Sequence, residues 1–368
     1  MNPIKALERR FSIITRYRYQ WVFIISIVWT LVDVLGWVAF MNQPIEERED
    51  TTIYTYLTDG AIVLRSIIVF TASFAMSYLL VFKLKRLFKH SPLFISFLLK
   101  TLILIVAAFL MYFLVNVTYS LFTLHVSPLQ AWYNFVGETM HRTWIYDKVS
   151  DWFTIFILTQ LLIEINEKYS PGVFIDILTG KYINPKIENR IVMFLDLKDS
   201  TPIAEQLGHK RYFRFIRDFI YSVSVALLES GGNIYQYVGD EIVVSWKLTT
   251  KNKLRCMQAV IAARRSIQKR SEAYRREYGI IPEFRVGMHV GEVTVGEIGV
   301  VKKDLAMSGD TMNTAARIRT ATSELNQKYL ASRDFVENLG LKEWQAESMG
   351  GIDLKGKSDE IELFALKI

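Results

Sequence analysis

The sequence predicts two parts of different fold class: an N-terminal α-helical membrane bundle and a C-terminal cytosolic α+β domain. Hydrophobic residues make up 51% of the 368 residues, and the mean hydropathy of +0.19 is high for a soluble chain of this length. The apolar excess lies in the first 166 residues. Beyond them, apolar runs of strand length alternate with stretches of helical periodicity. We therefore expect helices packed over a mostly antiparallel sheet in the C-terminal part.

Three apolar stretches are long enough to cross the hydrocarbon core of a bilayer, which takes about 20 helical residues. They are residues 21–41, 61–82 and 94–117. A fourth stretch, residues 152–163, is shorter and has charged residues at both ends. Taken alone, its length would indicate an interfacial or buried helix. The charge of the connections, however, favours a fourth span.

The connections between the apolar stretches differ in charge, which predicts their side of the membrane. Residues 1–19 and 83–89 are basic, whereas residues 46–59 contain five acids and one arginine. By the positive-inside rule, the two basic segments are cytoplasmic and the acidic one is external. Only a fourth span returns the remaining chain to the cytoplasm. We therefore expect a multi-pass protein of the inner (plasma) membrane, in contact with lipid, whose N-terminus and C-terminal domain are cytoplasmic.

Three charged residues, Asp33, Arg65 and Lys100, lie inside predicted spans. Charge within a membrane is costly and usually faces protein or water, so these residues could form a ligand or ion site. Alternatively, they pair with one another or extend toward a membrane interface. We favour the alternative, because Arg65 and Lys100 lie within about two turns of a span end. The predicted membrane domain comprises residues 1–168.

The cysteine content and the placement of the positive charge narrow the class of protein. Cys256 is the only cysteine, so an internal disulfide framework is excluded and a reducing compartment is indicated. The net charge of +7 would suit nucleic acid, but much of the basic surplus flanks the spans, where it attracts anionic lipid headgroups. We expect no nucleic-acid partner. Pro171 and Gly172 end the last membrane helix, and residues 169–189 form a short connector.

The C-terminal domain, residues 190–368, shows strand and helix signals in a clear order. Residues 190–196 form a strand, and residues 202–229 form a helix with Thr201 as its N-cap and Pro202 at its first position. The further expected elements are a hairpin of residues 234–238 and 242–246, a helix at 253–278, a second hairpin of 283–290 and 293–298, a helix at 311–325 and a closing strand at 361–368.

Two acidic residues lie at the ends of predicted strands. Asp196 ends the first strand, and Asp240 lies in the turn of the first hairpin. Neighbouring strands would bring the two carboxylates to one place. A few carboxylate oxygens with coordination positions left open suit Mg²⁺ that is bound together with phosphate oxygens. Asp240 alone would indicate an ordinary acidic turn, but for the pair we favour a metal site.

Four separated motifs mark this domain. They are FLDLKDST at 194–201, YVGDE at 237–241, GMHVGEV at 287–293 and SGDTMNTAAR at 308–317. In order and spacing they resemble the catalytic domain of bacterial, membrane-anchored class III nucleotidyl cyclases, over residues 172–368. The resemblance implies an adenylate cyclase of cyclic-nucleotide signalling. Such an enzyme converts ATP to 3′,5′-cyclic AMP and pyrophosphate in a head-to-tail homodimer.

The resemblance also implies the residues that bind metal and phosphate. Asp196, Asp240 and the carbonyl of Leu197 match the ligands of two Mg²⁺ ions per site, for which Mn²⁺ can substitute; two such ions stabilise the attacking and leaving oxygens together. Main-chain amides of the following turn, which opens a helix, would hold phosphate at the helix N-terminus. These substrate-binding residues are Lys198, Asp199, Ser200 and Thr201.

The remaining part of such a site comes from elsewhere in the dimer. Asn313 and Arg317 match the catalytic pair, supplied by the other subunit, that orients the ribose and neutralises charge on the α-phosphoryl group. Their spacing of four places them on one helix face. Without the resemblance, a solvated surface helix would be the simpler interpretation. Lys355 and Lys357 match the segment that binds the triphosphate.

Two positions that would contact the base depart from the family pattern. Gln236 stands where adenylyl cyclases typically carry Lys, and Ala306 where they carry Asp or Thr; guanylyl cyclases usually have Glu and Cys. A Gln amide both donates and accepts, so it could face adenine or guanine. We favour ATP, because the bacterial proteins of this kind are mostly adenylyl cyclases. The alternatives are a guanylate cyclase and a catalytically inactive nucleotide-binding or dimerisation module.

Overall fold

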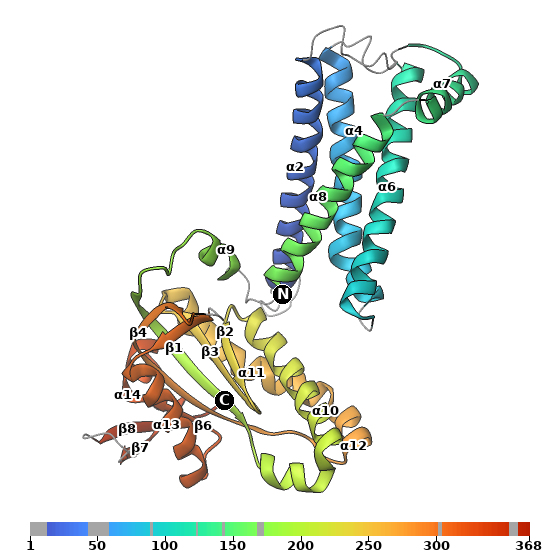
Figure 1. Ribbon diagram of the computed structural model, residues 1–368. Coiled ribbons are helices and arrows are strands. Elements are labelled where there is room, and N and C mark those ends of the chain that lie inside the picture. The colour runs from blue at the N-terminus through green and yellow to red at the C-terminus, as the bar shows by residue number, and fades with distance from the viewer. Residues whose placement is uncertain are drawn as a thin grey trace, which may run out of the picture. The chain divides into compact units, whose positions relative to one another are not determined.

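The computed structural model describes residues 13–42, 59–88, 91–122, 124–141, 144–167, 173–300, 304–352 and 360–368. They form two compact units, one within Thr15–Lys168 and the other within Tyr169–Ile368, to which Ile13 and Ile14 are also assigned. The described part of the first unit is helical, and that of the second combines helices with a single sheet (Figure 1). The predicted combination of a helical membrane part and an α+β domain is therefore confirmed.

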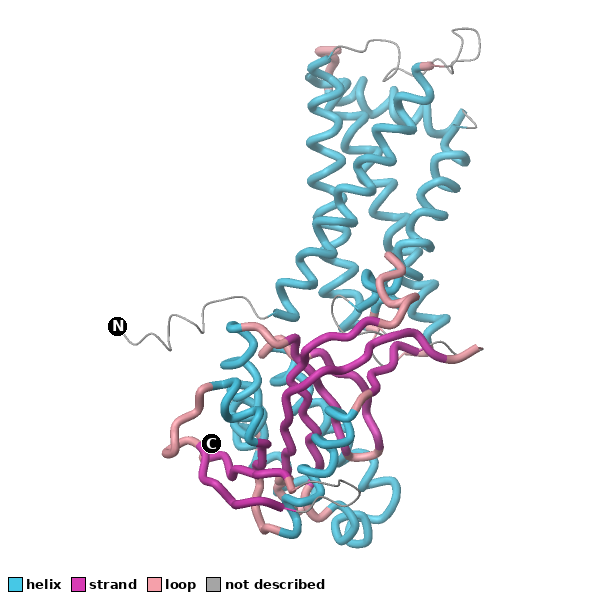
Figure 2. The backbone as a smooth tube through the Cα atoms, turned by 90° about the vertical axis from the view of Figure 1, so that its left-hand side faces the viewer, coloured by secondary structure: helices cyan, strands magenta, loops and turns pink. Residues whose placement is uncertain are grey.

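The first unit is built from long helices that run side by side (Figure 2). Trp29 and Phe156 are fully buried in its core, where their ring centroids lie 4.9 Å apart. The Trp29 indole donates a hydrogen bond to Thr159. The described helices are α2 (Ile13–Met41), α4 (Asp59–Tyr78), the π-helix η2 (Leu79–Leu84), α5 (Lys85–Leu87), α6 (Leu93–Phe122), α7 (Pro128–His141) and α8 (Trp144–Asn166).

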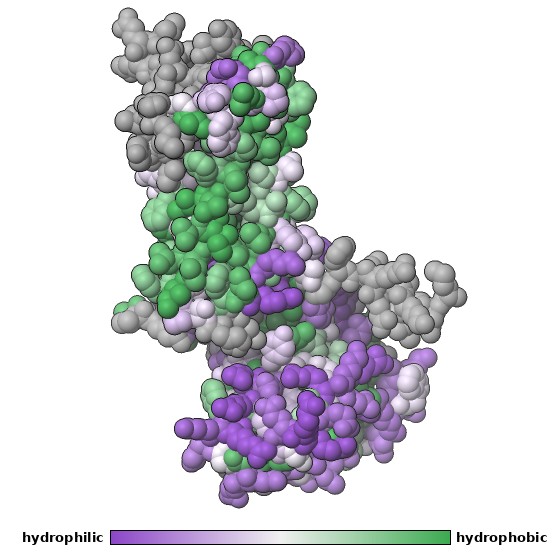
Figure 3. Space-filling model, turned by 90° about the vertical axis from the view of Figure 1, so that its right-hand side faces the viewer, coloured by the Kyte–Doolittle hydropathy of each residue, from purple (hydrophilic) through white to green (hydrophobic). Residues whose placement is uncertain are grey.

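Three described helical segments are long and apolar enough to cross a membrane: Ile13–Ala39, Ile62–Leu87 and Leu93–Phe122. Apolar side chains cover the outer surface of this unit on the face seen in Figure 3. The exposed apolar side chains of the bundle as a whole include Ile27, Leu31, Val63, Ile67, Leu98 and Leu110. The fourth predicted span corresponds to α8, which does not meet the same criteria. Its sequence carries charged residues near both ends, and these lower its apolar character.

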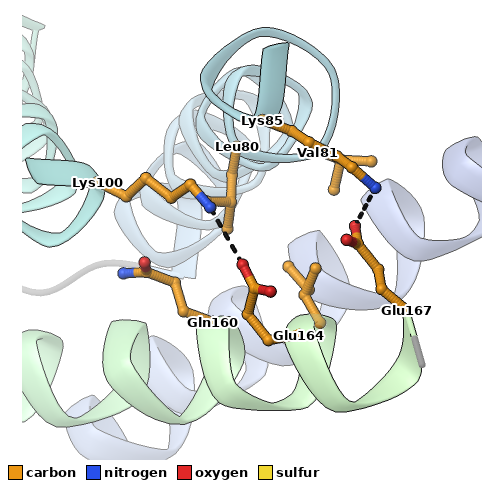
Figure 4. Close-up of a pocket in the computed structure, with 8 residues that line it drawn as sticks. Leu80, Val81, Lys85, Lys100, Gln160, Glu164 and Glu167 are labelled. Atoms are coloured by element: carbon orange, nitrogen blue, oxygen red, sulfur yellow. Dashed lines mark hydrogen bonds and ion pairs between the residues drawn. The ribbon is translucent and has the colours of Figure 1, made fainter. Parts of the chain in front are cut away.

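Charged residues inside the bundle are paired between helices. Arg65 donates two hydrogen bonds, of 3.0 and 2.9 Å, to the Asp33 carboxylate, as expected for pairing within the spans. Lys100, for which pairing or outward extension is expected, lies 3.3 Å from Glu164 of α8. Figure 4 shows this pair beside a second one, Lys85 with Glu167, at a small pocket that is also lined by Leu80 and Gln160. The first pair joins α6 to α8, and the second joins α5 to the residue that follows α8.

The second unit contains an eight-stranded sheet with the order β2-β3-β1-β4-β6-β8-β7, in which β5 pairs with β4. Every pairing is antiparallel except the one between β4 and β6. The predicted, mostly antiparallel sheet is thus confirmed. The strands are β1 (Lys186–Leu197), β2 (Asn233–Val238), β3 (Glu241–Lys247), β4 (Phe284–Ile298), β5 (Asp304–Ser308), β6 (Tyr329–Ser332), β7 (Ala346–Ile352) and β8 (Ile361–Leu366).

Helices cover both faces of the sheet, and the alternation of β1 explains how. Ile191, Met193 and Leu195 pack with residues of α10 and α11 in one core cluster, whereas Val192 packs with Met312 of α13 in another. Successive strand residues point to opposite faces, so α13 lies opposite α10 and α11. The helices are α9 (Val173–Leu178), α10 (Ser200–Glu229), α11 (Thr250–Lys269), α12 (Ser271–Tyr278), α13 (Asp310–Glu324) and α14 (Arg333–Leu339).

The second predicted hairpin is wrong, because residues 283–298 lie almost entirely in one long strand, β4. Gly287 and Gly291 lie in this strand where α13 approaches closely. A Cβ atom would lie 2.2 Å from the Arg319 amide nitrogen at Gly287, and 2.5 Å from Thr311 Oγ1 at Gly291. Both glycines therefore make room for α13 against the strand.

Two further predictions about helices need correction. Thr201 is not the N-cap of α10; Asp199 is, in a left-handed conformation with φ 57°, and α10 begins at Ser200. The helix predicted over residues 253–278 is divided at Arg270 into α11 and α12. The sequence pattern does not predict the short elements α9, β5, β6, α14 and β7.

Cys256 lies in α11 and is fully buried in the core between the sheet and its helices. Burial raises the pKa of its thiol to about 12. Because the thiolate is the reactive species, this cysteine is unreactive near neutral pH.

Candidate active site at the end of the central strands

Asp196 lies at the end of β1, opposite Glu241 of β3 on one side and Arg285 of β4 on the other. Its neighbours Leu195 and Leu197 are buried toward α10. The alternation of the strand therefore directs the Asp196 carboxylate to the face that α13 covers. The Asp196 side chain is 21% exposed, so the carboxylate lies at a partly open edge.

The turn between β2 and β3 brings Asp240 to the same edge. Gly239, with φ 63°, allows the chain to reverse there. Asp240 is half-buried, and its Oδ2 atom is buried without a hydrogen-bond partner among the described residues. Burial raises the pKa of Asp196 to about 6, with Arg319 opposing and the charges of Asp240 and Glu241 reinforcing the shift. The two predicted carboxylates are therefore close enough to interact.

Arg319 of α13 provides positive charge beside the acidic residues Asp196 and Glu241. Its Nη1 lies 3.5 Å from Asp196 Oδ2, and its Nε lies 2.8 Å from Glu241 Oε2. Burial also raises the pKa of Glu241, against the opposing charge of Arg319. Sequence reasoning missed both Glu241 and Arg319. The position of Glu241 beside Asp240 could have indicated the former, whereas no motif signalled the latter.

These donors suit a hard divalent cation. Asp240 has a buried carboxylate oxygen without a partner among the described residues, and Asp196 presents a second carboxylate beside it. Within the described ranges, no group of three or more His, Cys, Asp or Glu side chains is arranged for a metal ion. Two carboxylates leave most coordination positions open to other oxygens, as is usual for Mg²⁺ held with a phosphate-bearing substrate.

The turn after β1 differs in part from the predicted phosphate cradle. The Lys198 amide donates to the Glu283 carbonyl at 2.8 Å, so it is not free to bind phosphate. The ammonium group of Lys198 lies 3.4 Å from the Glu283 carboxylate and 3.7 Å from that of Asp199. Ser200 and Thr201 form the first turn of α10, where amides lack partners within the helix. The amides of Ser200 and Thr201 therefore remain the candidates for binding phosphate at this turn.

Asn313 and Arg317 lie on α13, as predicted. Asn313 is exposed and Arg317 is half-buried, and Arg317 has no ion pair among the described residues. At 3.6 residues per turn, Arg317 projects about 200° away from Arg319. Since Arg319 contacts Asp196 of its own chain, Arg317 points away from those carboxylates.

The positions expected to contact the base lie on β2 and β5. Gln236 is exposed on β2, and Ala306 is half-buried on β5, opposite Gly296. The adjacent residues Tyr235 and Leu305 pack against the same hydrophobic cluster, so both strands border one face of the sheet. Lys355 and Lys357 lie outside the described residues.

A family comparison decides the class of this domain. The family described as "Adenylate and Guanylate cyclase catalytic domain" matches residues 183–367, which include the carboxylate edge and α13. The chain belongs to this family. The resemblance seen in the four motifs is therefore confirmed, and class III cyclases are generally metal-dependent, in agreement with the donors of the site.

Several named adenylate cyclases are similar to the chain. "Adenylate cyclase 2" of Rhizobium meliloti (strain 1021) is 30% identical over 207 residues, which cover 56% of this chain and 57% of that protein. "Adenylate cyclase" of Anabaena cylindrica is 26% identical, over 55% of this chain and 42% of that protein. The chain thus spans about half the length of these relatives.

A solved structure supports the fold of the cyclase domain. A bacterial light-regulated adenylyl cyclase superposes with a TM-score of 0.52 at 18% identity, over 62% of this chain and 66% of that one. At this identity the similarity speaks for the fold alone. The arrangement of strands and helices around the carboxylate edge is that of the family.

Proposed function

We propose that this chain is an adenylate cyclase, which converts ATP to 3′,5′-cyclic AMP and pyrophosphate. In this reaction the ribose 3′-oxygen forms a bond to the α-phosphorus and loses its proton, while the bond from the α-phosphorus to the pyrophosphate oxygen breaks. Family membership and the names of the relatives support the reaction class. The observation that carries the proposal is the meeting of Asp196 and Asp240 at one edge of the sheet.

Asp196 and Asp240, with the carbonyl of Leu197, would hold two divalent cations, Mg²⁺ in the first place with Mn²⁺ able to substitute. When bound, such cations lower the pKa of the attacking hydroxyl and neutralise the triphosphate. The buried, unpartnered Oδ2 of Asp240 supports this role, because a buried carboxylate oxygen without a partner is costly. The amides of Ser200 and Thr201 would donate to phosphate at the start of α10.

The complete site would lie between two copies of the chain in a head-to-tail homodimer. Arg317 projects away from the carboxylates of its own chain, because Arg319 occupies the helix face toward them. Asn313 and Arg317 would therefore serve the partner's site, where Asn313 orients the ribose and Arg317 stabilises the charge that grows on the α-phosphoryl group. Each dimer would contain two such sites.

The membrane part would place this enzyme at the inner (plasma) membrane, with the cyclase domain in the cytoplasm. Three helices have the length and composition of spans, and α8 packs with them in the core of the same bundle. The basic segments at residues 1–19 and 83–89 support a cytoplasmic N-terminus. Residues 169–189 would connect α8 to the cyclase domain.

Product formation by the purified full chain tests the proposal. With Mg²⁺ or Mn²⁺, we expect cyclic AMP from ATP at a higher kcat/KM than cyclic GMP from GTP. Asp196→Ala should abolish both products without loss of folding, whereas Glu272→Ala, which removes an exposed carboxylate, should not. A preference for GTP would assign the chain as a guanylate cyclase through Gln236. The absence of any cyclic nucleotide would indicate a nucleotide-binding or dimerisation module instead.

A further inference from the structure

Arg319 connects two parts of one chain: the carboxylates proposed to bind the cation, and the helix proposed to serve the partner's site. Its guanidinium contacts Glu241 at 2.8 Å and Asp196 at 3.5 Å, from the helix that carries Asn313 and Arg317. The side chains of Arg319, Asp196 and Glu241 are between 13 and 29% exposed, so water screens these interactions only in part. The contact therefore ties α13 to the ends of β1 and β3.

The packing beneath Arg319 makes this tie rigid. Gly287 of β4 lies directly under α13, and its missing side chain lets the Arg319 backbone approach the strand. Met312 and Ala315 of the same helix are buried in the cluster on this face of the sheet. The backbone contact at Gly287 and the ion pairs of Arg319 lie side by side, so we expect α13 to move together with the ends of β1 and β3.

Arg317 is separated from Arg319 by a single residue but projects in nearly the opposite direction. One helix therefore has two functions: Arg319 faces the carboxylates of its own chain, and Arg317 faces outward, toward the site of the second chain under the proposed function. Because only about half a helical turn separates the two residues, a displacement of Arg319 also moves Arg317.

We propose that Arg319 is a positioning residue that couples the two active sites of the dimer. It neutralises Glu241 and leaves Asp196 and Asp240 as the pair for the cation; it also fixes α13 so that Arg317 reaches the partner's substrate. A divalent cation at Asp196 competes with one of the two contacts of Arg319. The occupancy of one site is thereby transmitted along α13 to the other. This inference rests on the proposed function and its head-to-tail dimer.

Dimers of two different full-length chains separate the two roles of Arg319. One chain carries Asp196→Ala and the other Arg317→Ala, each with its own affinity tag, so that tandem purification yields a dimer with a single intact site. That site uses Asp196 of the second chain and Arg317 of the first. Arg319→Gln is then added to either chain, and Arg275→Gln, which removes an exposed ion pair with Glu272, is the matched control.

Arg319→Gln in the chain that supplies Arg317 should lower kcat about tenfold and leave the Mn²⁺ concentration for half-maximal activity unchanged. In the chain that supplies Asp196, it should lower that Mn²⁺ concentration several-fold, because the competing positive charge is gone, with a smaller effect on kcat. Arg319→Lys keeps the positive charge but cannot contact Asp196 and Glu241 in the same way. Compared with Arg319→Gln, it should therefore return the Mn²⁺ dependence to that of the parent chain more fully than it returns kcat. Arg275→Gln should change neither quantity.

Calorimetric titration of Mn²⁺ into the substrate-free Arg319→Gln homodimer provides a readout that does not depend on turnover. We expect binding several-fold tighter than in the parent chain, whereas a merely misfolded site would bind Mn²⁺ more weakly. Equal effects of Arg319→Gln in the two chains, or weaker Mn²⁺ binding, would overturn the coupling role. If the parent pair of chains shows no complementation, the head-to-tail dimer itself is wrong and the inference falls with it.

Discussion

Asp196 lies directly opposite Glu241 in the register of β1 and β3, and one guanidinium group, that of Arg319, contacts both carboxylates. The charge of Asp240 acts on both carboxylates, so three acids lie close together at this edge and Arg319 pairs with two of them. The edge therefore costs folding stability in the absence of bound cations. Such a cost is common where binding groups must be held in place before the ligand arrives.

The raised pKa of Asp196 predicts how stability depends on pH. Folding raises the pKa of this carboxyl group from its ordinary value of 3.8 to about 6, so the group stabilises the fold fully below about pH 4. That contribution is lost as the pH rises through 6. Asp196→Asn should therefore be more stable than the parent chain at pH 7 without divalent cations, by on the order of 1 kcal/mol, and equal to it below about pH 4. Thermal unfolding of both chains across this range measures the effect.

Added Mn²⁺ gives the complementary result. The parent chain should gain more thermal stability from Mn²⁺ at pH 7 than at pH 5, because protons compete with the cation for Asp196. Asp196→Asn should gain little at either pH. A gain that does not change with pH would contradict the assignment of Asp196 as a metal ligand.

A further prediction concerns Arg190, whose side chain is 4% exposed. It donates hydrogen bonds to the Glu188 carboxylate at 2.7 and 2.9 Å and to Ser245 at 2.8 Å. Arg190→Ala removes these bonds from both partners, so we expect the free energy of unfolding to fall by about 3 kcal/mol. Denaturant unfolding measures this loss. Arg275→Ala breaks an exposed ion pair and should change the free energy of unfolding by less than about 1 kcal/mol. Equal losses for Arg190→Ala and Arg275→Ala would show that burial does not decide the effect.

The surroundings of Gly287 and Gly291 predict that a methyl group at Gly287 is more damaging to the fold than one at Gly291. Gly287→Ala places Cβ against the Arg319 backbone, which cannot move away alone, so stability and cyclase activity should both fall strongly. Gly291→Ala meets chiefly the Thr311 hydroxyl, and Thr311→Ala should partly rescue it. The same second change should not rescue Gly287→Ala. Gly36→Ala, where nothing lies within 4 Å, is the control, and rescue of both variants would contradict the backbone contact.

The pair of Asp33 and Arg65 predicts coupling within the bundle. Asp33→Asn and Arg65→Gln each break a largely buried ion pair, and each should lower the unfolding free energy of the full chain in detergent by up to about 3 kcal/mol. The double variant should lose clearly less than the sum of the two single losses. Circular dichroism during thermal unfolding provides the comparison. Additive losses would mean that the two residues act separately.

The parts of the fold that could be predicted are those with a strong local pattern. The spans follow from long apolar stretches, and β1 follows from the run that ends at Asp196. The sequence pattern predicts two strands, 283–290 and 293–298, where the structure has the single strand β4. Gly291 lies between them, and a glycine within a strand can accompany a turn or a close approach by another element. Only the position of α13 distinguishes the two. The short strands β5, β6 and β7 carry too few residues for a periodic signal.

The motifs led to the predicted site residues Asp196, Asp240, Asn313 and Arg317, and the structure brings the first two together at one edge of the sheet. Arg319 could not be found in this way, because its partners are distant in sequence and only the register of β1 and β3 brings them together. The position of Lys198 in the motif suggests that its amide binds phosphate, but the pairing of the strand end with Glu283 decides its hydrogen bond. Both differences arise from tertiary contacts.

The buried thiol of Cys256 has a practical consequence. As the sole cysteine of the sequence, with its pKa raised to about 12, it should resist maleimide and methanethiosulfonate reagents in the folded protein. New cysteines introduced at exposed positions could therefore carry spin labels or fluorophores against a silent native background. Distances between labels in the bundle and labels on α13 could then be followed while nucleotide and Mn²⁺ are added, without first removing a native side chain from the core.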